Sequence, residues 1–197
     1  LCFALGLGAC AHPPASNDAT SVHSTSPGAI QETPAMTSTT SASPRLDAEQ
    51  SLLRLLELIR GSRSIDGITA DRLQQTFGVT FDAEAGVLGF GERLTRDWGS
   101  SFEFDPADGG RFEFAFMPEP AGSYPPMGEI CRLDFDRFAA ELQAMGFRRE
   151  TYRGEHNRVI HDRFERAGLT VTVYTRGEAD EPPAKITHAC VLRVLVN

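Results

Sequence analysis

The chain has 197 residues, with 27 acidic and 19 basic side chains and a formal net charge of −8 at pH 7. No basic stripe is present to neutralise phosphates, so the composition excludes nucleic acid as the expected partner. All of the basic residues and all but two of the acidic ones follow residue 44. The chain therefore divides into a nearly uncharged first part and one domain's length of ordinary globular composition.

Residues 1–9 form a short apolar run that ends in small residues immediately before Cys10. The run is too short to span a bilayer, which needs roughly 20 apolar residues, but it fits the apolar part of a signal peptide. Residues 7–10, Leu-Gly-Ala-Cys, resemble the lipobox of bacterial lipoproteins. The resemblance implies cleavage before Cys10, acylation of that cysteine and a lipid-anchored periplasmic protein, with Ala11 favouring the outer membrane. An ordinary secretory signal is the alternative.

Residues 10–44 consist almost entirely of Ser, Thr, Pro, Ala and Asn. Such a segment cannot bury enough apolar surface to offset its ordering entropy, so we expect a disordered tether. A flexible chain of this length has a root-mean-square span of roughly 30–35 Å, enough to hold a domain clear of lipid headgroups. Residues 45–197 are then predicted to form a single globular domain.

Three helices are predicted within this domain from capping signals and apolar periodicity. The first carries a wide leucine stripe, and the third places its apolar side chains on one face. The predicted N-caps are Asp47, Thr69 and Asp134, and the predicted stops are Gly61, Gly78 and Gly146.

Alternating apolar and polar residues predict strands between and after these helices. Residues 98–116 are expected to form one hairpin around a glycine-containing loop, and residues 158–175 a second. The last segment, 188–196, is apolar on both faces apart from Arg193, and strands buried on both faces are usually central. The element order is then two helices, three or four strands, a helix and four strands. The predicted fold class is α+β, a mostly antiparallel sheet with helices packed on one face.

Two of the four cysteines remain for the folded domain if Cys2 leaves with the signal and Cys10 is acylated. Cys131 and Cys190 would close a loop of about 60 residues, and a disulfide of that span contributes on the order of 4 kcal/mol in the chain-entropy model. Because the expected compartment is oxidising, a disulfide is the favoured interpretation. Two buried free thiols are the alternative.

No nucleophile elbow, H-E-x-x-H zinc motif, glycine-rich phosphate loop or C-x-x-C pair occurs in the sequence. We therefore expect no enzymatic activity, no metal and no cofactor. The weaker alternatives are a metal site at His156, His161 and Asp162, a calcium site at Asp105 and Asp108, and a glycosidase-type carboxylate pair at Glu103 and Glu113.

The best functional indication is an acidic group in the first hairpin, which consists of Glu103, Asp105, Asp108 and Glu113. If Phe104 lies opposite Phe112, Glu103 and Glu113 become direct cross-strand neighbours, and like charges placed so are destabilising. An acidic face kept at that cost indicates a basic protein partner, because complementary charge steers association. A solvated strand face in another register is the alternative.

A second candidate contact surface is the proline-rich loop 117–129, which contains Tyr124 and Met127. Prolines limit the entropy lost on binding, and Tyr and Met are common interface residues. A plain surface crossing is the alternative interpretation of this loop.

The combination of lipid anchor, tether and small acidic α+β domain is similar to the immunity lipoproteins that bacteria with contact-dependent killing systems keep in the periplasm. The similarity lies in overall organisation, and the lipobox is its one motif. It implies a non-catalytic protein-binding module that inhibits a secreted antibacterial toxin with a basic face. The alternatives are a structural or assembly lipoprotein of the cell envelope and an envelope hydrolase.

Overall fold

The computed structural model describes residues 45–177 and 189–197, which belong to the second of two compact units, Ser41–Asn197. The predicted signal segment, Cys10, the tether and His188 lie outside the described residues. Within the described ranges, no helix is long and apolar enough to cross a membrane.

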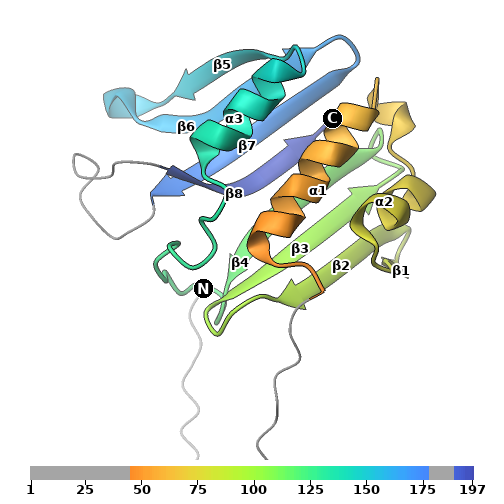
Figure 1. Cartoon of the computed structure of the whole chain (residues 1–197), viewed down its shortest axis with the longest axis horizontal. Helices are drawn as coiled ribbons and strands as arrows, with labels where there is room; N and C mark the ends of the chain where they lie inside the picture. Colours follow the sequence, from red (N-terminus) through yellow and green to blue (C-terminus); the bar gives the residue numbers. More distant parts are fainter. Residues whose placement is uncertain (1–44, 178–188) are drawn as a thin grey trace, which may run out of the picture. The chain divides into compact units, whose positions relative to one another are not determined.

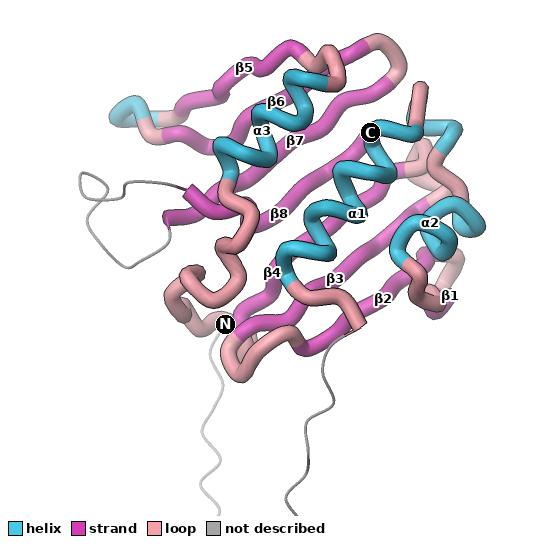
Figure 2. The backbone as a smooth tube through the Cα atoms, in the orientation of Figure 1, coloured by secondary structure: helices cyan, strands magenta, loops and turns pink. Residues whose placement is uncertain are grey.

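The described residues form an α+β fold, in which one antiparallel sheet carries its helices on a single face (Figure 1, Figure 2). The helices are α1 (Ala48–Gly61), α2 (Ala70–Phe77) and α3 (Phe135–Ala144), with short 3₁₀ turns η1 (Ile65–Gly67) and η2 (Glu155–Asn157). The strands are β1 (Asp82–Glu84), β2 (Val87–Arg93), β3 (Trp98–Asp105), β4 (Arg111–Pro118), β5 (Arg148–Arg153), β6 (Val159–Arg166), β7 (Leu169–Gly177) and β8 (Ala189–Val196). Their order in the sheet is β1-β2-β3-β4-β8-β7-β6-β5. The predicted fold class is confirmed.

The helix starts follow the predicted caps. Asp47 accepts a hydrogen bond from the Gln50 amide at 2.7 Å, and the Gln50 side chain accepts one from the Asp47 amide at 3.1 Å. At the starts of α2 and α3, the Thr69 and Asp134 side chains accept hydrogen bonds from the Arg72 and Arg137 amides, without the reciprocal bond. Gly78 ends α2 with a φ of 69°, a left-handed conformation that favours glycine.

The core lies between the helices and the face of the sheet that they cover. Alternation along β3 and β4 points Phe102 and Phe114 into it, and both are fully buried. Phe77 of α2 meets Phe102 edge-on, with ring centroids 4.5 Å apart. Strand β8 lies between β4 and β7, which confirms the prediction of a central last strand.

The opposite face of the sheet carries no described helix (Figure 1). It presents the other set of alternating side chains, among them Glu103, Glu113, His161, Tyr174 and Arg193. We call this the helix-free face. An antiparallel sheet tolerates such an arrangement because one of its faces can be polar and solvated.

The predicted order, with three or four strands before the third helix and four after it, is confirmed, since the structure has four on each side. The sequence pattern does not assign residues to β1, β2 or β5. Strand β2 has Gly89 and Gly91 where an outward-facing side chain would stand, so its alternation is weak. Strand β5 is at the sheet edge and is almost entirely polar. Both depend on their neighbours rather than on their own apolar pattern.

Candidate functional site

The first hairpin has the register on which the acidic-face hypothesis depends. Phe104 lies opposite Phe112, and Glu103 lies opposite Glu113 on the helix-free face. The end of the hairpin at the 105–111 turn, with Glu103, Asp105, Asp108 and Glu113, is called the acidic end below. Glu103 is exposed, whereas the Glu113 side chain is only 19% exposed.

Arg193 of strand β8 reaches this pair across the helix-free face. Its Nε lies 2.5 Å from Oε1 of Glu113, and its second guanidinium nitrogen donates to Oε2 at 2.8 Å. This hydrogen bond to Glu113 raises the pKa of Arg193, against the lowering effect of burial. Within the hairpin itself, Arg111 is the only basic residue. Arg193 therefore relieves part of the expected repulsion between the two glutamates. Its position as the single charged residue in an apolar strand is the sequence feature that could have indicated this role.

The two aspartates of the acidic end have roles in the turn. Asp105 accepts hydrogen bonds through Oδ1 from the Ala107 and Asp108 amides, at 2.9 and 3.2 Å, as Asx turns do. Asp108 pairs with Arg111 at 2.9 Å, and both side chains are about half exposed. Exposed pairs of this kind contribute about 1 kcal/mol or less. The turn chemistry thus accounts for these two aspartates without a bound calcium ion.

The histidines of the alternative metal site are not brought together with Asp162. His161 lies on the helix-free face, where its ring stacks on Tyr152 at 4.7 Å and meets Tyr174 at 5.4 Å. Asp162 points to the opposite face, is 1% exposed, and accepts hydrogen bonds from Arg149 and Thr151. His156 lies in η2, away from regular strand geometry. Over residues 45–177 and 189–197, no group of three or more His, Cys, Asp or Glu side chains could hold a metal ion.

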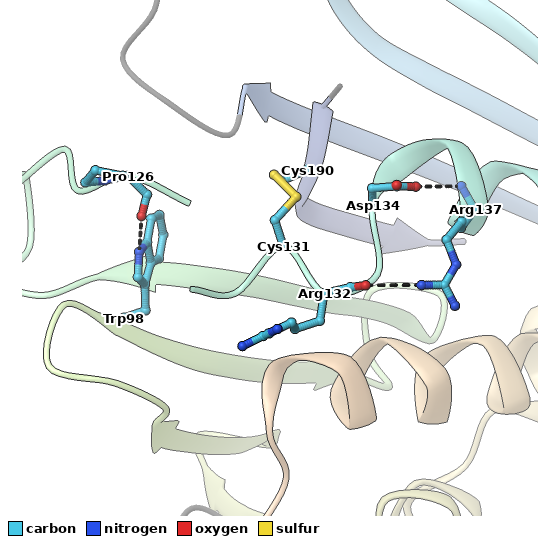
Figure 3. The surroundings of a disulfide bond; sticks show 7 residues. All are labelled: Trp98, Pro126, Cys131, Arg132, Asp134, Arg137 and Cys190. Carbon is cyan, nitrogen blue, oxygen red and sulfur yellow. Dashed lines mark hydrogen bonds between the residues drawn. A yellow bond between two sulfur atoms is a disulfide. The ribbon is translucent and has the colours of Figure 1, made fainter. Parts of the chain in front are cut away.

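The proline-rich loop divides into an exposed and a buried part. Tyr124 is 67% exposed, and the Arg176 guanidinium lies 3.5 Å from its ring centroid. Met127 is fully buried in the core, so it is not available to a partner and the expectation of a contact role for it is corrected. The loop also closes over Trp98, whose indole nitrogen donates to the Pro126 carbonyl at 3.0 Å (Figure 3).

A disulfide joins the end of this loop to the sheet. Cys131 and Cys190 are bonded, with their Cα atoms 5.3 Å apart (Figure 3). The bond ties the segment before α3 to the start of the central strand β8, and Asp134 forms an isolated bridge to Cys190 beside it. The end of the loop near Cys131 therefore has a structural role, because it covers the core.

The two predicted contact surfaces lie at opposite ends of the same hairpin. Trp98 pairs with Pro118 at the loop end, and Asp105 pairs with Arg111 at the acidic end. At roughly 3.3 Å per residue, the strands separate these ends by about 23 Å. This distance lies within the span of one protein interface of standard size, so one partner can contact both surfaces. The acidic end, which carries the exposed carboxylates, is the candidate site.

The chemistry available at the acidic end is the binding of cationic groups. Exposed carboxylates accept hydrogen bonds from Lys and Arg, and Arg can do so through two parallel bonds. The carboxylate pair does not resemble a glycosidase pair, because Glu103 is exposed and Glu113 is ion-paired, whereas a general acid needs burial to raise its pKa. Comparisons with protein-family models, curated proteins and solved structures return no match to this chain.

Proposed function

We propose that this protein is a non-catalytic binding module of the bacterial cell envelope, held at a membrane by a lipid on Cys10, that inhibits a secreted antibacterial effector by covering a basic surface on it. The observation that carries the proposal is the cross-strand pair Glu103 and Glu113 on the helix-free face. Of these two carboxylates, Glu113 is paired with Arg193 of the neighbouring strand β8.

The negative charge at the acidic end that is not offset by a basic residue supports a cationic partner. Arg193 is paired with Glu113 and Arg111 with Asp108. Within the part of the chain that the structure describes, Glu103 and Asp105 form no ion pair. A lysine or arginine of a partner beside Glu103 would relieve the cross-strand repulsion and add an attraction, so association becomes faster at low salt.

The location rests on the N-terminal sequence. The lipobox-like residues 7–10 and the polar segment 10–44 supply an anchor and a tether. The disulfide between Cys131 and Cys190 fits an oxidising compartment such as the periplasm. A variant Cys10→Ser is expected to lose the lipid mass and the membrane attachment. Unchanged fractionation and unchanged mass would remove the extracytoplasmic location and the proposal with it.

Capture of the partner tests the binding function. The chain is used as bait in periplasmic extracts and in co-expression with secreted toxins encoded beside its gene. Glu103→Lys is expected to weaken the captured complex at least tenfold, because it places a like charge against the basic partner. The matched control is Glu57→Lys on α1, where the native carboxylate is also exposed and pairs with Arg54. No specific partner, or equal loss in both variants, would contradict the proposal.

The phenotype of a deletion mutant distinguishes a structural role in the envelope from the proposed inhibitory role. A structural or assembly lipoprotein is needed in monoculture, so its deletion perturbs the envelope of cells grown alone. Loss of an immunity-type inhibitor is harmful only when the effector is present. An envelope defect in monoculture that persists after deletion of the neighbouring toxin gene would favour the structural role.

A further inference from the structure

An apolar groove of about 520 Å³ lies beside the acidic end, on the helix-covered side of the sheet. Its side-chain lining comes from the segment that leads into α2, from β2 and from the first hairpin: Ile65, Ile68, Ala70, Leu88, Phe104 and Pro106. Ile68 and Phe104 are 3% and 4% exposed, so the floor of the groove is the edge of the core itself. Ile65 and Leu88 are only partly buried and form its walls.

Three glycines in two turns border the groove. Gly86, Gly109 and Gly110 line it, and all three have positive φ values, between 65° and 89°. A left-handed backbone of this kind favours glycine, because a Cβ atom would be strained there. Around Gly86 and Gly109, a Cβ atom would meet no heavy atom within 4 Å. At these three positions the turns border the groove without a side chain.

The rim of this groove is negatively charged. Asp66 lines it directly and is exposed. Asp108 is exposed and belongs to the turn whose Pro106, Gly109 and Gly110 form one wall, whereas Asp105 faces the helix-free side with Glu103. Arg111 pairs with Asp108, so the rim keeps an excess of negative charge. An apolar floor inside a carboxylate rim is complementary to an apolar side chain with cationic neighbours.

We infer that this groove receives one apolar side chain from a partner segment that carries Lys or Arg on both sides of it. The inference rests on the proposed function and names the chemistry of the partner that the acidic end would bind. The side chain loses its apolar surface to the floor formed by Ile68 and Phe104, while its flanking cations meet Asp66 and Asp108. Buried apolar anchors surrounded by a polar rim are the usual energetic centre of such contacts.

The charges argue against the other occupants. Residues 1–44 of this chain contain no Lys or Arg, so that segment has no cation to place against the rim. A second copy docking through the same end would set carboxylates against carboxylates, which is repulsive. An anionic lipid headgroup is repelled for the same reason. A basic segment of another protein is the occupant that satisfies both the floor and the rim.

The direct test is a peptide titration of the full 197-residue chain, labelled with ¹⁵N and followed by NMR. The probe is a seven-residue peptide with leucine at its centre and three lysines on either side. We expect saturable shifts of the amides of Asp66, Ala70, Leu88 and Gly110. A peptide with glycine at the centre should bind at least tenfold more weakly, and one with glutamates in place of the lysines should cause no shift.

Two matched variants test the position. Ala70→Phe places a ring in the groove and should weaken binding of the leucine peptide at least tenfold. Ala140→Phe makes the same substitution at an exposed position of α3 and should leave binding unchanged. Asp66→Asn with Asp108→Asn should weaken binding severalfold without filling the groove. Equal binding of the glycine and leucine peptides, or shifts that lie elsewhere in the domain, would overturn the inference.

The experiments distinguish an error in the groove inference from an error in the proposed function. If a partner is captured and Glu103→Lys weakens it but Ala70→Phe does not, the groove inference is wrong and the binding function stands. If the leucine peptide binds in the groove but no protein partner is captured, the proposed function is wrong and the groove is a peptide-binding site.

Discussion

The two ends of the first hairpin use the same pair of strands in different ways. At the Trp98–Pro118 end, the proline-rich loop and the disulfide close over the core, and Trp98 and Met127 are fully buried. At the Asp105–Arg111 end, glycine turns leave the core edge open as a groove with a carboxylate rim. Both ends carry residues typical of interfaces. Whether such a residue is part of the core or of the surface depends on what packs over it.

The largest expected effect is at the closed end. The double variant Cys131→Ala, Cys190→Ala should lower the free energy of unfolding by about 4 kcal/mol, because it restores the entropy of a long unfolded loop. Urea denaturation of the oxidised wild type and the variant measures this. A reducing agent should shift the wild type to the variant's midpoint and leave the variant unchanged. Equal midpoints without the agent would show that the disulfide does not stabilise this end.

The burial of Met127 gives the next prediction. Met127→Ala should cost about 3 kcal/mol of unfolding free energy, because it removes a fully buried side chain and leaves a cavity. Met117→Ala, at a position that is 46% exposed, is the control and should cost less than about 1 kcal/mol. Similar losses in both variants would mean that the loop does not close over the core.

At the acidic end, a smaller effect is expected from Arg193. Arg193→Met removes the cation paired with Glu113, beside the cross-strand neighbour Glu103, and should destabilise the fold by about 1 kcal/mol. Adding Glu113→Gln should recover part of that loss, since the cross-strand repulsion is then removed as well. The double-mutant cycle is measured by urea denaturation at low salt. Additive losses would show that Arg193 does not act through Glu113.

The smallest effect is a stabilisation. Glu103→Gln removes one charge of the like-charged cross-strand pair, so the free energy of unfolding should rise by a few tenths of a kcal/mol at low salt. The gain should fade in 1 M salt, where the screening length is about 3 Å. The control is Glu49→Gln in the first turn of α1, where loss of a favourable helix-dipole contact should be slightly destabilising. A destabilising effect of Glu103→Gln would contradict the account of the acidic end.

Local signals were sufficient for much of this molecule. The caps at Asp47, Thr69 and Asp134 follow from the sequence alone, because each depends on residues a few positions apart. The α+β class and the central position of the last strand follow from hydrophobic periodicity for the same reason. For the first hairpin the sequence leaves more than one register open, and the structure has the one that sets Glu103 opposite Glu113.

Only the tertiary structure decided which of these residues are available to a partner. Met127 is buried and Arg193 pairs with Glu113 because elements distant in sequence are packed together. The groove needs the segment before α2, strand β2 and the hairpin turn side by side, and no single stretch of sequence encodes that arrangement. Periodicity reports which face of a strand is apolar, whereas exposure is a property of the assembled layers.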